Sequence, residues 1–269
     1  MEVLIVDFRR STIVLIISFL LLNIFLLFTY KDLKQQIAPA ANGNINIIDQ
    51  MRSDGISVVG LTNDKEEAAV VQITPSDIET QVETLVNQKA EYEKGTITSI
   101  LTQSIPIEIT NAVNQDSFKQ VTDFIHESVI NGKQYELFSF QLTNKVVIYQ
   151  QMVGTIPIVD KKAQIIVNLN DKNEAVSYEQ TYVGKTEILG EPRQLISSQV
   201  AVETLYLAGS IPARTMIEKP KLVYYETLAL SDLSIYSPAW YIELRVGEGA
   251  TITKKVDAIR GNIISSEAE

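Results

Sequence analysis

The feature that most constrains this chain is an uncharged stretch near its N-terminus. Twenty residues, from Ser11 to Tyr30, contain no charged side chain. A helix of that length rises about 30 Å, which is the thickness of a bilayer's hydrocarbon core. The apolar segment of a cleaved signal peptide is shorter, about 7–15 residues. An A-x-A pattern at residues 38–40 lies well past the stretch, which is a poor position for cleavage. We therefore predict a retained transmembrane helix over residues 11–30.

The charges that flank this stretch do not decide its orientation. Two basic residues precede it, Arg9 and Arg10, and two follow it, Lys31 and Lys34. Long domains cross a membrane largely regardless of nearby charge, and the first ten residues are too short to form a domain. We therefore predict a cytoplasmic tail at 1–10, a juxtamembrane linker at 31–44, and an extracytoplasmic domain beyond it. The predicted location is the cell membrane, with a single pass.

The composition of the remaining chain narrows its partners. The formal net charge is −10, and the four charged residues before residue 30 cancel, so the excess of acid lies after residue 30. An acidic domain does not favour nucleic acid or an anionic lipid surface. The chain has no cysteine, which excludes disulfides and lipid modification of a cysteine. Burial of apolar side chains must therefore stabilise the fold.

The pattern after the linker predicts an α+β fold. Helical periodicity is found at residues 74–88, 116–132 and 191–209. The first two begin with capping boxes, Ser76 with Glu79 and Ser117 with Gln120, while Pro192 suits the first turn of the third. Strand-like runs follow the second helix, at 134–142, 145–153, 163–169 and 175–183, and the third, at 221–230, 237–246 and 250–259. We predict two α+β domains, residues 45–190 and 191–269, each a helix packed on an antiparallel sheet.

Weaker patterns complete this reading of the chain. Residues 45–60 suggest a short helix that leads into a strand, and residues 90–109 a loop with one strand. In the run 237–246, Trp240, Ile242 and Leu244 alternate with polar side chains, which predicts a half-buried antiparallel strand and a buried Trp240.

The sequence contains few of the residues and motifs that enzymes use in catalysis. His126 is its only histidine, so one chain cannot build a multi-histidine metal site. We interpret His126 as a partly exposed helix residue. No G-x-S-x-G, glycine-rich phosphate loop or H-E-x-x-H motif is present. The oxygen-rich residues 170–174, "NDKNE", lack the ligand spacing of a calcium loop and predict a hairpin turn. The sequence predicts no enzyme activity, no metal and no cofactor.

One polar residue lies inside the apolar stretch. The amide of Asn23 is costly to place against lipid, and it could hydrogen-bond to another transmembrane helix. Alternatively, it is a tolerated polar residue without a partner. A candidate interface can be drawn along its helical face from Thr12, Ile16, Phe19, Asn23 and Leu27.

The N-terminal segment resembles the start of the YycI family. Members begin with Asp, an aromatic residue and two basic residues, followed by a span with an "LNxFL" core, and here 7–10 and 22–26 match this pattern. The closing segment, "SPAWYIEL…VDAIRGNII", resembles the final hairpin of YycH, YycI and PepSY-like domains. The residues before Asp7 depart from the pattern, so we interpret "MEVLI" as an upstream extension and Val6 as a candidate initiator.

The resemblance implies a function without catalytic residues. YycI proteins are single-pass regulators of the essential WalK (YycG) sensor histidine kinase, which controls cell-wall metabolism in Gram-positive bacteria. It implies two partners, a kinase of that type and a YycH-like companion. Two other hypotheses remain: a tethered PepSY-like inhibitor or binding module that acts on a protease or wall protein, and an anchored hydrolase, which the missing motifs disfavour.

Overall fold

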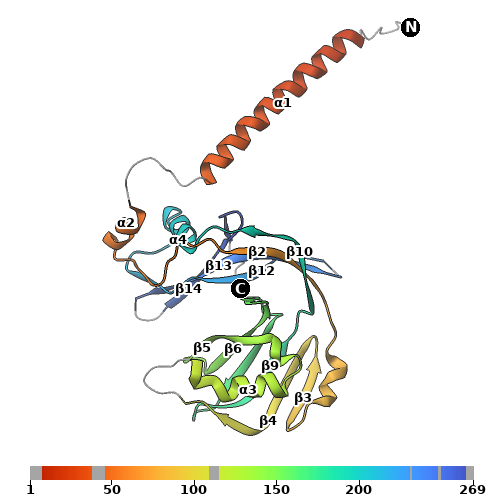
Figure 1. Ribbon diagram of the computed structural model, residues 1–269, viewed down its shortest axis with the longest axis vertical. Helices are drawn as coiled ribbons and strands as arrows, with labels where there is room; N and C mark the ends of the chain where they lie inside the picture. The colour runs from red at the N-terminus through yellow and green to blue at the C-terminus, as the bar shows by residue number, and fades with distance from the viewer. Residues whose placement is uncertain (1–7, 38–45, 109–114, 231, 248–249, 265–269) are drawn as a thin grey trace, which may run out of the picture. The chain divides into compact units, whose positions relative to one another are not determined.

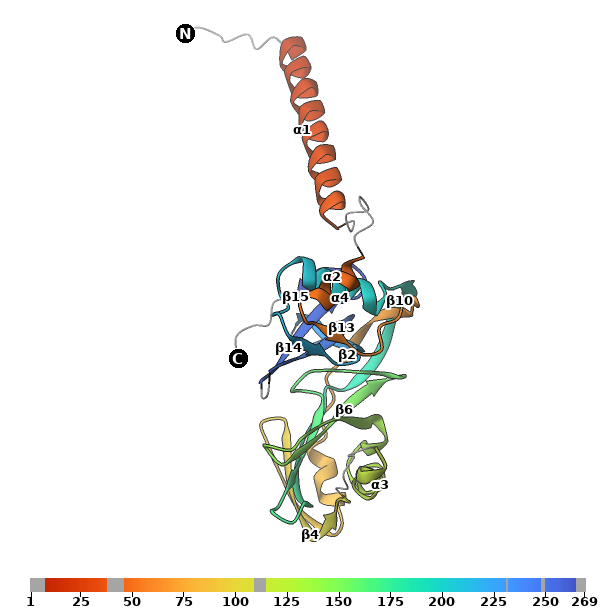
Figure 2. The ribbon, with the colours of Figure 1, turned by 90° about the vertical axis from the view of Figure 1, so that its left-hand side faces the viewer.

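The computed structural model describes residues 8–37, 46–108, 115–230, 232–247 and 250–264 (Figures 1 and 2). Its internal contacts divide the chain into two units, Met1–Ser53 and Asp54–Glu269. Parts of the predicted tail and linker, the proposed extension before Val6, and the last residues of the chain lie outside the described residues.

The described residues of the first unit form two helices. Helix α1 runs continuously from Phe8 to Ile37 and includes the predicted span 11–30. Within the part of the chain that the structure describes, no helix meets both the length and the apolarity that a membrane crossing requires. Helix α2, Ile47–Ser53, begins where the side-chain oxygen of Asn46 accepts a hydrogen bond from the backbone N–H of Ile48. A short helix followed by a strand was predicted here, and α2 followed by β1 confirms it.

The second unit is built on two sheets, which are antiparallel except for one short parallel pair in sheet A. Sheet A has the long strand β13 at its centre and comprises β1 Ser57–Val58, β2 Glu67–Thr74, β10 Lys185–Gln194, β11 Thr215–Ile217, β12 Lys221–Ala229, β13 Ser234–Val246, β14 Ala250–Asp257 and β15 Ile263–Ile264. Sheet B has the order β3-β4-β9-β8-β6-β5, with bounds β3 Gln88–Glu93, β4 Thr96–Pro106, β5 Tyr135–Gln141, β6 Val146–Val153, β8 Gln164–Leu169 and β9 Glu174–Thr181. The short strand β7, Ile156–Pro157, pairs with β6.

One helix packs against each sheet. Helix α3, Lys119–Ser128, places Val121 and Ile125 in a core with Tyr149 and Tyr178 of sheet B. Helix α4, Ser198–Leu207, lies against sheet A (Figure 1) and has a side chain cap, because Ser197 Oγ accepts a hydrogen bond from the N–H of Val200. The two-layer α+β architecture that the sequence predicted is present in both halves of the second unit.

Sheet B is an insertion between two neighbouring strands of sheet A. The chain leaves sheet A at Thr74, the last residue of β2, and returns at Lys185, the first residue of β10, and these two residues are paired. Gly184 lies at the crossing with φ +115°, and a Cβ on it would lie 2.1 Å from the carbonyl oxygen of Thr74. The two connections therefore pack backbone against backbone, which only glycine permits there. The predicted domain boundary at 190/191 falls inside β10, and sheet A takes strands from both sides of it.

Several local predictions were wrong at helix starts. Within residues 74–88, where a helix was predicted, the structure has only a 3₁₀ helix, η1 Glu79–Thr84. Its N-cap, Ile78, makes no side-chain capping bond, and Ile78 packs instead in the core of sheet B. Helix α3 begins at Lys119 with Phe118, not Ser117, as N-cap. Pro192 belongs to β10, at an irregularity in its pairing with β2, where a missing N–H costs no ladder bond.

Of three other local predictions, one differs from the structure and two agree with it. Residues 90–109, predicted as a loop with one strand, contribute to the hairpin of β3 and β4. The turn at 170–174 is confirmed: the backbone N–H of Asn170 donates to the carbonyl of Glu174, closing the β8–β9 hairpin. Trp240 is confirmed as buried, with 4% of its surface exposed.

Candidate interaction sites

The five residues predicted as an interface follow one side of α1. With 100° per residue, Thr12, Ile16, Phe19, Asn23 and Leu27 fall within about 80° of the helix circumference and cover about 22 Å of its length. All five are exposed. The Nδ2 of Asn23 donates a 2.8 Å hydrogen bond to the carbonyl of Phe19, one turn earlier. This back-bond satisfies part of the amide and leaves its carbonyl oxygen and a second N–H for other partners.

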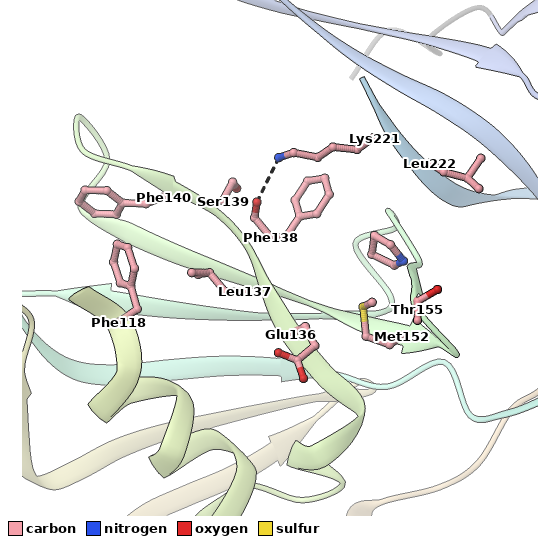
Figure 3. A pocket seen from close by; sticks show the side chains of 11 residues that line it. Phe118, Glu136, Leu137, Phe138, Ser139, Phe140, Met152, Thr155, Lys221 and Leu222 are labelled. Atoms are coloured by element: carbon pink, nitrogen blue, oxygen red, sulfur yellow. Dashed lines mark hydrogen bonds between the residues drawn. The ribbon is translucent and has the colours of Figure 1, made fainter. Parts of the chain in front are cut away.

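A second candidate site lies in the second unit, where sheet A meets the β5 edge of sheet B. We call it the inter-sheet groove (Figure 3). It has a volume of about 590 Å³, and its lining is mainly apolar and aromatic. The lining residues are Phe118, Glu136, Leu137, Phe138, Ser139, Phe140, Met152, Thr155, Pro157, Lys221 and Leu222. Its volume lies within the range of about 300–1,000 Å³ that ligand sites span, and the groove is open to solvent.

A bulge in β5 shapes the floor of the inter-sheet groove. The register with β6 shifts between Leu137 and Ser139, so Phe138 is the extra residue. Bulges re-aim side chains at sheet edges. Here the ring of Phe138 lies edge-on to Tyr241 of β13, with 5.3 Å between the ring centroids. Such a pair contributes about 0.5–1.5 kcal/mol beyond area burial.

Lys221 crosses the groove from sheet A to sheet B. In Figure 3 it extends from β12 over Phe138. Its Nζ donates a 3.3 Å hydrogen bond to the carbonyl of Phe138 and lies 4.6 Å from the centroid of that ring. The carboxylate of Glu243 is 3.7 Å away. The side chain is 40% exposed, and an ammonium has three N–H donors, so the group can still bind an acceptor that enters the groove.

The opposite charge enters the lining from β5. The Glu136 side chain is 54% exposed, and its carboxylate lies 3.7 Å from Nε2 of His126. That same Nε2 is 2.9 Å from the carbonyl of Tyr135. Because a carbonyl only accepts, Nε2 carries the proton. His126 is a partly exposed residue of α3, as the sequence predicted, and it fastens the helix to the start of β5.

An acidic hollow adjoins the inter-sheet groove. It has a volume of about 480 Å³ and shares Glu136 and Leu137 with the groove. The rest of its lining comes from the start of α3 and the turn before it: Asp116, Lys119, Thr122 and Asp123. Lys119 donates a 2.6 Å hydrogen bond to Asp123, which raises the pKa of the lysine. Three carboxylates and one ammonium therefore line this side.

Two glutamine side chains bind the C-terminal end of α3 and the segment after it. The amide of Gln88 donates to the carbonyl of Ser128 at 2.8 Å, and the amide of Gln180 donates to that of Ile130 at 2.6 Å. The first bond satisfies a carbonyl in the last turn of α3, which a helix leaves without an internal partner, and the second binds the segment just after the helix. The C-terminal end of α3 is thereby fixed relative to sheet B.

The predicted and observed sites do not overlap. The sequence prediction selected α1 and missed Phe138, Lys221 and Glu136. The only local sign of the groove in the sequence is the run from Leu137 to Phe140, in which adjacent apolar residues break the alternation of a strand. Among the described residues, no group of three or more His, Cys, Asp or Glu is arranged to hold a metal ion.

Comparison with known proteins decides the family. The profile of the YycI protein family matches residues 34–259, most of the chain. This chain belongs to the YycI family. The family that the sequence resembles is thereby confirmed, although the match begins after the N-terminal pattern at 7–10 and 22–26. YycI is known as a regulatory accessory family, and membership suggests a role in regulating the WalK/YycG kinase system.

The other comparisons add little to the YycI assignment. No curated protein matches the sequence. A crystal structure of an uncharacterized protein from Eubacterium rectale ATCC 33656 is similar at 10% sequence identity and a TM-score of 0.42. The match covers 79% of this chain and 89% of that one, and it is too distant to support an argument.

Proposed function

We propose that this YycI protein is a membrane-anchored accessory regulator of a sensor histidine kinase of the WalK/YycG type. The family match over residues 34–259 is the observation that carries the proposal. Regulation is by protein–protein contact, through one face of α1 and the domain that follows. A YycH-like companion is the second proposed partner, and the net charge of −10 argues against nucleic acid.

Anchoring is assigned to α1. Its stretch from Ser11 to Tyr30 carries no charge, and the large apolar side chains described there, from Ile13 to Phe28, are exposed. Exposed apolar surface of this extent marks a contact with a membrane or a protein, and this supports the proposed anchor. We place residues 1–10 in the cytoplasm and the chain after the linker outside.

The contact in the membrane is assigned to the Asn23 face. Lipid provides little hydrophobic drive for helix association, so packing and polar contacts must supply it. The remaining N–H and oxygen of Asn23 can bond a kinase helix, a contribution of about 0.6–2 kcal/mol. Binding shifts the kinase between signalling states only by its difference in affinity for the two states.

Disulfide cross-linking in membranes tests this face. The chain has no native cysteine, so each introduced cysteine reports alone. Paired with cysteines along the kinase's transmembrane helices, the Asn23 face should cross-link, whereas the opposite face serves as the matched control. The first set is Ile16→Cys, Phe19→Cys, Asn23→Cys and Leu27→Cys, and the control set is Val14→Cys, Leu21→Cys and Phe25→Cys. Asn23→Leu should weaken association about three- to thirtyfold and alter output from the kinase's target promoters.

Two outcomes would contradict the proposal: a lack of specific cross-linking, and activity that survives replacement of residues 11–30. Equal cross-linking from both faces, with unchanged signalling in Asn23→Leu, would leave α1 without a specific contact. Replacing residues 11–30 by an unrelated span separates the alternative function. A tethered PepSY-like inhibitor keeps its activity after this replacement, whereas a regulator that depends on helix contacts loses it.

A further inference from the structure

We propose that the inter-sheet groove binds an extended segment of a partner polypeptide, in which one apolar side chain is flanked by an acidic and a basic residue. The proposal goes beyond the regulatory function and does not depend on the contacts of α1. It rests on the order of charged and apolar side chains along the groove and the acidic hollow.

The apolar part of the site accepts the anchor side chain. The ring of Phe140 packs on the buried ring of Phe118, with centroids 5.2 Å apart, and Phe138 and Leu137 continue the apolar surface along β5 (Figure 3). Phe138 and Phe140 are only partly buried. An apolar side chain placed here would cover aromatic surface that is now exposed to water.

The charges on either side of this surface have opposite sign. Lys221 enters from sheet A beside Glu243, and the N–H donors that its ammonium keeps free can bind the acidic residue of the segment. On the other side, Glu136 and the acidic hollow carry three carboxylates against one ammonium, so this side favours a basic residue. A small apolar molecule would fill the groove but would not use both charges.

The groove recognises side chains, not an added β-strand. β5 is the edge of sheet B, but the carbonyls of Tyr135 and Phe138 already accept hydrogen bonds from His126 and Lys221. These bonds reduce the backbone acceptors open to a new strand. Affinity must therefore come from the anchor and the two charges.

Fluorescence anisotropy with labelled peptides tests the proposal on the full chain in neutral-lipid nanodiscs, with empty nanodiscs subtracted. In an extended chain every second side chain faces the same side. The probe Asp-Thr-Leu-Thr-Lys therefore presents an acid, an anchor and a base together. A second peptide replaces Leu by Ala, and a third replaces Asp by Lys. We expect the first peptide to bind at least tenfold more tightly than either of the others.

A charge exchange provides the decisive control. Lys221→Glu should reverse the preference, so that the peptide with two lysines binds more tightly than the first peptide. Lys89→Glu makes the same change in net charge on the exposed strand β3, away from the groove, and should keep the original preference. Because Lys221 is partly exposed, its replacement leaves the buried cores intact.

Three results would overturn the proposal. The first is no saturable binding of the first peptide. The second is tighter binding of the doubly basic peptide to the unaltered protein, which indicates only attraction to an acidic surface. The third is that an apolar dye binds, that Phe138→Ala abolishes its binding, and that the protein shows no preference among the three peptides. That result would assign the groove to a small apolar ligand. None of these results bears on the cross-linking of α1, so the two proposals fail separately.

Discussion

Trp240→Ala is the most direct test of the core of sheet A. The ring is 4% exposed and lies between Leu222 of β12 and Val256 of β14 in the strand register. A tryptophan buries about 150–250 Å², which at 25 cal/mol per Å² corresponds to about 4–6 kcal/mol as an upper limit. Large-to-small changes of buried aromatic residues cost about 3–5 kcal/mol. We expect Trp240→Ala to reduce the free energy of unfolding by that amount.

The indole N–H adds a separate contribution. Nε1 donates a 2.8 Å hydrogen bond to the carbonyl of Ile196, which lies just before α4. Trp240→Phe keeps an aromatic ring but removes this donor. The partly buried carbonyl then loses a partner, and leaving such a group unpaired costs up to about 1–3 kcal/mol. We therefore expect Trp240→Phe to be less destabilising than Trp240→Ala.

Urea unfolding of residues 45–269, followed by circular dichroism, measures both effects. With a slope of about 2.5 kcal/mol per M, the loss in Trp240→Ala corresponds to a midpoint lower by about 1.2–2 M. Leu207→Ala is the control, because Leu207 is 58% exposed at the end of α4 and its loss should stay within about 0.5 kcal/mol. A loss below about 1 kcal/mol in Trp240→Ala would refute the core assignment and make Trp240 a candidate binding residue.

Two further predictions concern the second unit. Gly184→Ala should lower the free energy of unfolding by about 2–3 kcal/mol or more, because φ is +115° and the new Cβ would meet the Thr74 carbonyl. Gly190→Ala is the comparison: it lies in open space at φ +73° and should lower the free energy of unfolding by about 1–2 kcal/mol. Equal midpoints of urea unfolding for the two variants would contradict the crossing at Gly184. Burial raises the pKa of Tyr149 and Tyr178 to about 12, against about 10 in the unfolded chain. Because the unfolded state loses these protons at a lower pH than the folded state, the free energy of unfolding should fall as the pH rises from about 10 towards about 12. Phenolate absorbance combined with urea unfolding checks this, and Tyr178→Phe, which removes one ionising group, should reduce the alkaline loss.

Local patterns in the sequence determined much of the secondary structure. The alternation around Trp240 predicts a strand with one buried side, because successive side chains of a strand point to opposite faces. The turn-forming residues 170–174 predict the β8–β9 hairpin for a similarly local reason, since both halves of the contact lie a few residues apart. The uncharged run from Ser11 to Tyr30 predicts a helix, and α1 contains it.

Helix starts depended on the surroundings as well as on the local sequence. Ser76 and Ser117 both fit a capping box, yet the N-caps are Ile78 and Phe118. Phe118 is 2% exposed, so its burial in the core of sheet B outweighs a cap contribution of about 1 kcal/mol. Pro192 suits a helix start equally well, but pairing of β10 with β2 draws it into a strand.

The inter-sheet groove was decided by tertiary structure alone. Nothing near Thr74 in the sequence indicates that its strand pairs with one that begins at Lys185, since the whole of sheet B lies between them. The bulge that turns Phe138 towards Tyr241 depends on the register of β5 against β6, and Lys221 reaches it from a strand 83 positions further along the chain. Strand register and the packing of distant segments are non-local choices, governed by which pairings bury the most apolar surface together. A reading of adjacent residues therefore finds the strands of this YycI protein but not the groove between its sheets.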